Sequence, residues 1–497
     1  MDYMFSAMLD VFSPVSLLFM LGGVIIGTIF GAIPGLTSTM GVALFVPITF
    51  GLDPVSGILL LIGVYYGGVS GGLVSATLLG IPGTPSSIAT TFDAFPMAKQ
   101  GEPVRALGIG ITASFIGGIF SFLALITISP IVSRYAVMMG PFEYAALTVF
   151  ALTLIVVLSK GNLIKGIASG LVGIAIAMIG FSPIDGTARF TFDVTALKAG
   201  ISLLPLIMGL FALSQIHHEI RSGQKQSEMN LKVSGLGISL GELLGNTWNL
   251  VRSSLIGIGF GILPGLGSGS SNLVAYAQAK QASKDPESFG KGNPAGIYAS
   301  ESSNNAAVGG ALIPMLTLGI PGDTVTAIML GGFMIHGIQP GPLLFTSNPD
   351  IVYTVFIGFL VAIIMVFLLQ MFGMRLFPKI LNVPANYLYP ILLVLTVVGA
   401  YTTNSTMFDV WVMLVFGAVG YFMMQNNYPI APLILGFVLA PILETYTRRA
   451  LMYSGNVLDF FTRPVSAIFL SLALIMLIIT IIKEYKEIAK KEDTVPL

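Results

Sequence analysis

Hydroxyl and amide side chains follow each of four Pro-Gly pairs, and their types point to anion binding. The pairs are Pro34-Gly35, Pro82-Gly83, Pro264-Gly265 and Pro321-Gly322. The candidate solute ligands that follow them are Thr37, Ser38, Thr39, Thr84, Ser86, Ser87, Ser268, Ser270, Asn272 and Thr324. Residues of these types cap helix N-termini, where free N–H groups and a partial positive charge attract anions. The pattern predicts a substrate site built from helix ends.

Basic side chains are absent from two long stretches that hold three of these breaks. Residues 1–98 and residues 292–374 contain neither Lys nor Arg. An anion bound there would depend on backbone N–H groups, hydroxyls and helix dipoles. Capping or close helix packing remains an alternative for any single Ser or Thr, because both residues are ordinary caps. The four breaks taken together favour a ligand site.

A polar run, Glu301 to Asn305, interrupts an otherwise apolar segment. Charged and amide side chains are costly in lipid and by default have a functional or tightly paired role. Asparagine oxygens are hard ligands that suit a bare alkali cation, and Asp323 is the one acid directly at a break. We predict that Asn304, Asn305 and Asp323 bind sodium. Asp323 as a simple helix cap and Glu301 as a charge at the membrane boundary remain alternatives.

Other kinds of chemistry find little support in the sequence. The chain has no cysteine, which excludes disulfides, thiol catalysis and Cys-ligated metal sites. His336 is the only histidine besides the pair at 217–218, so sodium is favoured over a proton relay as the coupling ion. No P-loop motif and no nucleophile–base constellation is present. We therefore expect a protein that is not an enzyme and has no cofactor other than sodium.

The elements that position these residues must be membrane helices. The 497 residues are 55% hydrophobic and only 9% charged, whereas soluble domains are about a quarter charged. Apolar runs of the length that a bilayer crossing needs recur along the chain. The clearest are 107–129, 163–181, 352–374 and 464–482. No basic segment precedes the first run, so we expect it to be retained rather than cleaved, and the zero net charge predicts no nucleic-acid partner.

Two motifs recur in the same order and predict two related halves. GAIPGLTS at 31–38 matches GILPGLGS at 261–268, and LGIPG at 79–83 matches LGIPG at 318–322. The alternative is that these are unrelated Gly-Pro helix breaks. The predicted segments are a first repeat at 1–216, a cytoplasmic connecting loop at 217–249, a second repeat at 250–449, and an extra span with a cytoplasmic tail at 450–497.

Charge placement predicts that the halves have opposite orientations. Lys and Arg near span ends mark the cytoplasmic side, and residues 253–279 lie between two basic loops. Each arm beside Pro264-Gly265 is too short to cross a hydrocarbon core of about 30 Å, which favours a re-entrant hairpin over one continuous crossing. Residues 16–50 form the same hairpin, with acidic flanks that open to the outside. The exceptions to the charge rule are Arg134, Arg189, Lys198, Arg448 and Arg449.

The predicted fold is an all-α polytopic membrane protein with inverted repeats, re-entrant hairpins and Pro-Gly-broken helices. It has about eleven crossings plus two hairpins, with the N-terminus outside and the C-terminus inside. Inverted repeats with broken helices are typical of secondary transporters, whose substrate sites form where half-helices meet near the membrane midplane. We expect an elevator mechanism, in which the hairpins and LGIPG segments move as one unit against the remaining spans.

Over nearly its whole length the sequence resembles the large membrane subunit of the tripartite tricarboxylate transporter family. The segments that carry the resemblance are GAIPGLTSTMGVALFVPITF, LLGIPGTPSSIATTFDAFPMAKQGEPVRALG, GILPGLGSGSSN, ESSNNAAVGGALIPMLTLGIPGD and HGIQPGP. The resemblance implies a bacterial inner-membrane location and usually sodium-driven uptake of citrate or related carboxylates. It also implies two partners, a small four-span membrane subunit and a periplasmic solute-binding protein. A stand-alone carboxylate permease or exporter is the alternative, and a membrane scaffold or sensor is a third class.

Overall fold

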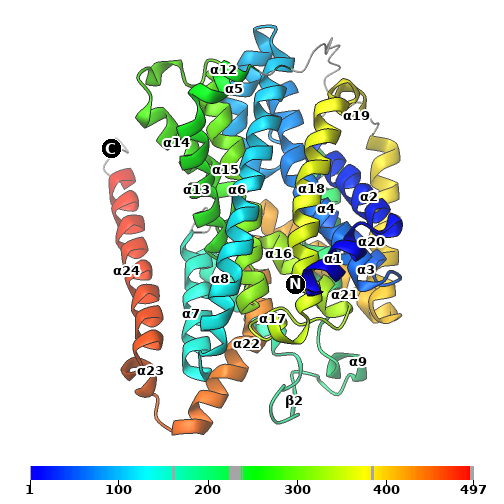
Figure 1. The fold of residues 1–497 in the computed structure, drawn as a ribbon. Helices are drawn as coiled ribbons and strands as arrows, with labels where there is room; N and C mark the ends of the chain where they lie inside the picture. The colour runs from blue at the N-terminus through cyan, green and yellow to red at the C-terminus, as the bar shows by residue number, and fades with distance from the viewer. Residues whose placement is uncertain (1, 159–162, 223–236, 238, 382–384, 493–497) are drawn as a thin grey trace. The chain divides into compact units, whose positions relative to one another are not determined.

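The computed structural model describes the chain except residues 1, 159–162, 223–236, 238, 382–384 and 493–497 (Figure 1). Nine helices among the described residues are long and apolar enough to span a membrane. Four shorter apolar helices add to them, at Ser38–Thr49, Pro141–Leu154, Leu163–Ala177 and Thr324–Ile335. The prediction of an all-α, multi-pass membrane protein is thereby confirmed, whereas the number of crossings and the hairpins remain predictions.

The chain divides into two compact units, and unit 1 comprises Met1–Arg134, Leu204–Ile262 and Leu266–Tyr421. Its elements are α1 (Asp2–Val11), α2 (Pro14–Ala32), α3 (Ser38–Thr49), α4 (Pro54–Leu78), η1 (Pro85–Ser87), α5 (Ile88–Lys99), α6 (Pro103–Val137), α10 (Leu203–Ile207), the π-helical η2 (Met208–Leu213), α11 (Ser214–Ser222), α12 (Leu240–Gly245), α13 (Thr247–Ile262), α14 (Gly267–Ala282), η3 (Pro286–Ser288), α15 (Pro294–Leu318), α16 (Thr324–Ile335), α17 (Leu344–Ser347), α18 (Pro349–Gly373), η4 (Met374–Leu376), α19 (Phe377–Leu381), α20 (Ala385–Asn404) and α21 (Met407–Gln425).

Unit 2 comprises Tyr135–Leu203, Leu263–Gly265 and Phe422–Leu497. Its elements are α7 (Pro141–Leu158), α8 (Leu163–Ala177), β1 (Gly180–Phe181), β2 (Ala188–Arg189), α9 (Thr195–Lys198), α22 (Ile430–Ser454), α23 (Asp459–Thr462) and α24 (Pro464–Glu492). Within it α22 packs on α7 and α8, and α24 packs on α7.

Each Pro-Gly pair lies between two helices, as predicted. The first pair separates α2 from α3, and Pro264-Gly265 separates α13 from α14. Gly35 has a φ of +88° and Gly265 a φ of +82°, a backbone conformation that side-chain-bearing residues rarely adopt. The two glycines therefore allow the chain to change direction between the helices on either side. The other two pairs follow the ends of α4 and α15.

Helices α4 and α15 form the centre of unit 1, and nearly every residue of each is buried. In α2, which packs along α4, a Cβ at Gly31 would lie only 2.1 Å from the carbonyl oxygen of Gly68. In α13, which packs along α15, a Cβ at Gly261 would lie 2.3 Å from the carbonyl oxygen of Ala307. Hydrophobic burial cannot drive the association of helices in lipid, so membrane helices associate through close packing, which small residues allow. The close contact keeps both central helices away from the surface.

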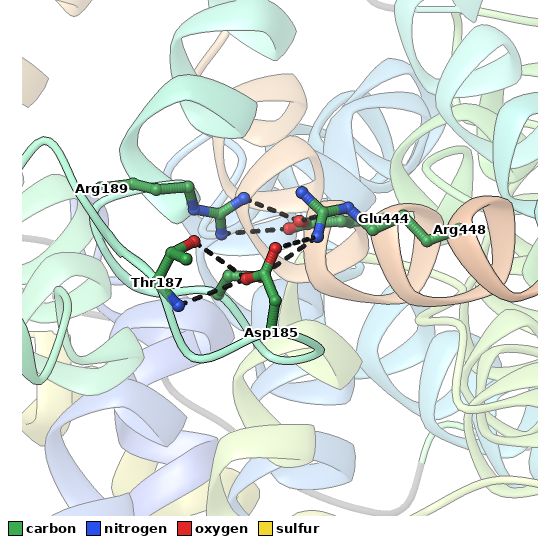
Figure 2. A network of polar contacts seen from close by, with 6 residues as sticks. Asp185, Thr187, Arg189, Glu444 and Arg448 are labelled. Carbon is green, nitrogen blue, oxygen red and sulfur yellow. Dashed lines mark hydrogen bonds and ion pairs between the residues drawn. The ribbon is translucent and has the colours of Figure 1, made fainter. Parts of the chain in front are cut away.

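A short β-hairpin in unit 2 departs from the all-helical prediction. Strands β1 and β2 pair antiparallel, Gly180 with Arg189 and Phe181 with Ala188. Arg189 donates two hydrogen bonds, of 2.7 and 3.1 Å, to the Glu444 carboxylate (Figure 2). Arg448 contacts both Glu444 and the hairpin residue Asp185. Two of the cations that break the positive-inside pattern are thus paired with acids.

The two ion pairs of this hairpin should differ in importance at pH 7. Arg189→Gln is expected to destabilise by about 1–2 kcal/mol, because it removes a bidentate, mostly buried bond to a charged group. Asp185→Asn is expected to change the thermal midpoint little, because exposed ion pairs contribute little. Thermal unfolding of the purified variants in detergent checks this, and an equal loss in both would contradict it.

The same pairing gives the hairpin a defined pH dependence. Hydrogen bonds from Ser182, Arg448 and Thr187 hold the pKa of the Asp185 carboxyl well below its usual value. The folded state therefore favours the ionised form. The contribution of the ionised Asp185 carboxylate to stability is complete above the pKa of an unfolded aspartate, about 3.9. It is lost as the pH falls toward the lower pKa of Asp185 in the folded state. Between pH 5 and 8 the stability difference between Asp185→Asn and the unaltered chain should stay constant.

Candidate functional site

The start of α3 meets the start of α16. The hydroxyls of Thr39 and Thr324 lie 3.4 Å apart, although 285 residues separate them in the chain. Thr37 caps α3 by accepting from the Met40 N–H at 3.1 Å. Asp323 caps α16 by accepting from an N–H in its first turn. Two helix N-termini, one from each broken region, therefore lie together.

The start of α14 meets the segment that follows the LGIPG sequence at 79–83. The Asn272 side-chain amide donates to the carbonyl of Ser86. In that segment the Thr84 hydroxyl lies 2.7 Å from the hydroxyl of Ser86 and 2.9 Å from that of Ser87. Pro85 also lies against Gly269, because a Cβ at that glycine would be 3.8 Å from the proline Cβ. Helix α14 therefore contacts the segment after the first LGIPG sequence, just as α3 contacts the start of α16 after the second LGIPG sequence.

The first residue of α14 joins these two contacts. A Cβ at Gly267 would lie 2.8 Å from the Cβ of Asp323, so only glycine lets α14 approach the α16 cap this closely. The segments that follow the four breaks therefore form one continuous chain of contacts, in the order 37–39, 323–326, 267–272 and 84–87.

The predicted substrate ligands divide into two groups by exposure. Thr37, Thr39, Ser268, Ser270 and Thr324 are partly exposed, whereas Ser38, Thr84, Ser86, Ser87 and Asn272 are buried. The first group is partly exposed at the surface of the described fold, and in the second group Asn272 and Ser86 join two segments through their hydrogen bond. Among the described contacts, none joins the Ser268 or Ser270 side chain to another residue of the set. Of the break residues, Gly83, Pro264, Pro321 and Gly322 are buried, while Pro34, Gly35, Pro82 and Gly265 are partly exposed.

Asn304 and Asn305, two of the predicted sodium ligands, lie in a fully buried polar cluster on α15. Its centre is Glu301, whose carboxylate accepts hydrogen bonds from the Thr90 hydroxyl of α5 at 2.5 Å and from the Ser114 hydroxyl of α6 at 2.9 Å. The Asn305 amide donates to the Ser114 hydroxyl at 2.8 Å. Glu301 is 0% exposed, so the structure does not place it at the surface of the fold.

Asp323, the third predicted sodium ligand, is engaged elsewhere. One oxygen accepts from the Tyr65 hydroxyl at 2.5 Å, and the other accepts from the N–H and the hydroxyl of Thr326, each at 2.8 Å. The Thr326 hydroxyl also accepts from the Asp323 N–H, which completes a reciprocal capping box. In the described residues no contact links Asp323 with Asn304 or Asn305. The geometry matches the helix-cap alternative for this residue.

The oxygen atoms around Glu301 are of the kind that can bind a sodium ion. The side-chain oxygens of Asn304 and Asn305 are buried and have no hydrogen-bond partner in the described part of the chain. Buried polar atoms without partners are rare and need an explanation such as a bound ion. In the same described ranges no group of three or more His, Cys, Asp or Glu side chains is placed to bind a metal.

Sequence reasoning overlooked Asp93, the acid that organises the turn before α15. One carboxylate oxygen accepts from the backbone N–H groups of Gly290, Gly292 and Asn293, at 2.8, 2.9 and 2.8 Å. The other oxygen accepts from the Tyr276 hydroxyl at 2.8 Å. An acid within an apolar helix was the available signal, under the same rule that singled out Glu301. Thr90, Ser114 and Tyr65 had no comparable signal, because hydroxyls are common in membrane helices.

A cavity of about 530 Å³ is lined by residues of unit 2, and none of the predicted ligands is among them. Its apolar lining includes Val149 of α7, Ile174 of α8, Met178 directly after α8, and Leu443 of α22. Arg189, Glu444 and Arg448, which are drawn in Figure 2, also line it. Because Arg189 and Arg448 are already bonded to acids, the cavity offers no free charge for a small anion. The broken helices of unit 1 are the stronger candidate site.

The sequence of this chain is similar to those of known proteins of one family. The model of the tripartite tricarboxylate transporter TctA family matches residues 17–435. An "uncharacterized 52.8 kDa protein in TAR-I ttuC' 3'region" of Agrobacterium vitis is 33% identical over 484 residues, which cover 97% of this chain and 96% of that protein. An "uncharacterized protein in TAR-II ttuC' 3'region" of the same organism is 36% identical over 236 residues, which cover 47% of this chain and 96% of that protein. No solved structure matches. The chain belongs to the tripartite tricarboxylate transporter TctA family.

Proposed function

We propose that the chain is the large permease subunit of a binding-protein-dependent secondary transporter that imports tricarboxylates or related organic anions with sodium. The observation that carries the proposal is the continuous chain of contacts among the four segments that follow the Pro-Gly breaks. Broken helices that meet in this way supply free N–H groups and positive helix ends to an anion. Family membership supports the transporter class and the tripartite organisation in general.

The partly exposed hydroxyls at the helix starts would bind the carboxylates of the solute. Thr39 lies two residues after the α3 cap and Thr324 directly follows the α16 cap, so their hydroxyls and the nearby N–H groups can donate to one carboxylate. With no Lys or Arg in the stretches around them, the negative charge of a tricarboxylate is only partly balanced. Co-transport of sodium would offset the remaining charge and supply the driving force.

The halves are proposed to be repeats of one unit in opposite orientations. Helices α2, α3 and α4 recur in order as α13, α14 and α15, and α4 and α15 both have 25 residues. The close contacts recur as well. A Cβ at Gly83 would lie 2.0 Å from the carbonyl oxygen of Gly31, and a Cβ at Gly322 would lie 2.5 Å from that of Gly261. Each pair joins an LGIPG segment to the first arm of its own hairpin.

Opposite orientation predicts that equivalent turns are reached from opposite sides of the membrane. The turn between α3 and α4 contains Gly51, and the turn between α14 and α15 contains Lys284; both residues are exposed. Gly51→Cys should react with a membrane-impermeant maleimide added to intact cells, and Lys284→Cys only after the inner membrane is opened. The chain has no cysteine of its own to interfere. Labelling of both from the same side would contradict the inversion.

An elevator mechanism is supported by the division into two compact units. Unit 1 contains the helices on both sides of all four breaks, although the residues of the third break, Pro264 and Gly265, are grouped with unit 2. Such a unit can move as a body relative to the rest of the chain. Spin labels on Glu287→Cys in unit 1 and Val457→Cys in unit 2, both at exposed positions, would report that movement. A distance distribution that does not change between sodium-free and sodium-plus-solute conditions would argue against it.

Uptake by proteoliposomes tests the proposal as a whole. The chain is reconstituted into proteoliposomes together with a small four-span membrane subunit. A periplasmic binding protein and one radiolabelled di- or tricarboxylate from a panel that includes citrate are then added outside. We expect uptake that requires the binding protein and an inward sodium gradient. Uptake that survives removal of both the sodium and the proton gradients would overturn the proposal. Uptake by the chain alone would favour a stand-alone permease.

A further inference from the structure

We infer that Glu301, together with the side-chain oxygens of Asn304 and Asn305, holds one monovalent coupling cation, and that Asp323 has no part in this site. The inference rests on the proposed sodium coupling and specifies where the ion is bound. It assigns the charged ligand to a residue of α15 rather than to the acid at the Pro-Gly break.

The charge of Glu301 has no counterpart among the described residues. The side chain is 0% exposed, and no Lys, Arg or His of the described ranges forms an ion pair with it. Its hydrogen-bond donors are all neutral groups: the Thr90 hydroxyl at 2.5 Å, the Ser114 hydroxyl at 2.9 Å and the Asn305 side-chain amide at 3.4 Å. An ionised carboxylate buried without a cation costs several kcal/mol. A bound cation removes that cost and explains why an acid occupies this position.

The amide oxygens add neutral ligands on the same face of the helix. Residues 301, 304 and 305 are spaced i, i+3 and i+4, so their side chains are neighbours on α15. The Asn305 nitrogen donates to the Ser114 hydroxyl, to the Glu301 backbone carbonyl and, at 3.4 Å, to the Glu301 carboxylate, and the Asn304 nitrogen donates to the Val69 carbonyl. Both amide oxygens are left without partners in the described structure. Each such buried acceptor costs about 1–3 kcal/mol unless it is bonded.

Asp323 differs from Glu301 because it caps the N-terminus of a helix, α16. Its two oxygens accept three hydrogen bonds from Tyr65 and Thr326. Neutral donors and the helix N-terminus stabilise a carboxylate at a cap position. Removing its charge should therefore weaken the start of α16 without removing a ligand of the ion.

The other central helix, α4, lacks the same ligands at the corresponding positions. The two LGIPG sequences are 239 residues apart. When α4 and α15 are aligned with that offset, Asn304 and Asn305 correspond to Tyr65 and Tyr66, and Glu301 corresponds to Ile62. Tyr66 donates its hydroxyl to the Ser114 carbonyl at 2.9 Å, so the aromatic pair provides hydrogen-bond donors where α15 provides free oxygens. The repeat is therefore symmetric in its helices but not in its ion ligands.

Direct sodium binding by the purified full chain tests the inference. Equilibrium binding of ²²Na⁺ in detergent and the thermal midpoint in sodium chloride against choline chloride are measured for the unaltered chain, Glu301→Gln and Asp323→Asn. We expect Glu301→Gln to lose at least about tenfold in ²²Na⁺ affinity and to lose its stabilisation by sodium. In choline its midpoint should equal or exceed that of the unaltered chain, because an uncompensated buried charge has been removed. Asp323→Asn should keep the ²²Na⁺ affinity with a lower midpoint in both salts.

The outcomes that contradict the inference differ from those that contradict sodium coupling. Unchanged ²²Na⁺ affinity in Glu301→Gln would overturn the assignment, as would loss of binding confined to Asp323→Asn. A lower midpoint of Glu301→Gln in choline, together with retained ²²Na⁺ binding, would make Glu301 a structural residue only. Absence of ²²Na⁺ binding by the unaltered chain, together with uptake in sodium-free medium, would instead contradict the proposed sodium coupling.

Discussion

An alanine at Gly31 is expected to lower the thermal stability of the chain sharply, by about 1–3 kcal/mol. The added Cβ would lie 2.1 Å from the carbonyl oxygen of Gly68 in α4, well inside the distance at which the two atoms touch. The obstacle is a helix backbone atom, which cannot rotate away as a side chain can. Helix α2 must therefore move off α4, and the contact between Gly83 and the Gly31 carbonyl is disturbed with it.

Gly22→Ala, in the same helix, is the matched control. A Cβ at Gly22 meets nothing within 4 Å, and alanine is favoured over glycine in a helix by about 1 kcal/mol. This variant should be as stable as the unaltered chain or slightly more stable. The same contrast should recur in α13 between Gly261→Ala and Gly259→Ala, since Gly259 also has open space.

The measurement is the midpoint of thermal unfolding in detergent. All variants are compared at one heating rate, because unfolding of such proteins is often irreversible. Equal midpoints for Gly31→Ala and Gly22→Ala would show that α2 and α4 are not packed as closely as the structure describes.

Asp93→Ala is the second substitution with a large expected effect. It removes the acceptor of three backbone N–H groups in the turn 290–293 and of the Tyr276 hydroxyl. Leaving buried donors of this kind unbonded costs about 1–3 kcal/mol each in the worst case, and partial access of water to the turn will reduce the total. We expect a loss of about 3–5 kcal/mol, comparable to breaking a buried polar network. The turn that leads into α15, and therefore into the Glu301 cluster, should loosen.

Trypsin cleavage at Lys291 reports that loosening directly, because this exposed lysine lies within the anchored turn. Cleavage should accelerate in Asp93→Ala. It should accelerate less in Asp93→Asn, which keeps one carbonyl acceptor. Asp285→Asn changes an exposed acid before the same turn and should leave both the midpoint and the cleavage rate unchanged. A rate that is the same in all three variants would mean that Asp93 does not hold the turn.

The sequence alone determined the class of this protein and the position of its helix breaks. Both follow from local properties. Sparse charge and long apolar runs require lipid as the solvent, and a Pro-Gly pair interrupts a helix wherever it occurs because proline lacks the N–H that the helix needs. The repeated motifs at 31–38 and 261–268 also predict which segments of the two halves correspond to each other. These features need no knowledge of what packs against what.

Only the tertiary structure decided which polar residues act together. Thr39 meets Thr324 across 285 residues, and Glu301 finds its donors in Thr90 and Ser114, on two other helices. The local pattern offers a helix-cap role for Asp323, which follows a Pro-Gly pair, but it does not show which of the two acids lies beside amide oxygens without partners. Their difference arises from packing: one carboxylate is satisfied by its own helix cap and a tyrosine, and the other is buried beside amide oxygens that have no partner in the described structure. Helix ends are local and can be predicted from sequence, whereas the completion of a buried hydrogen-bond network depends on side chains brought together by the fold.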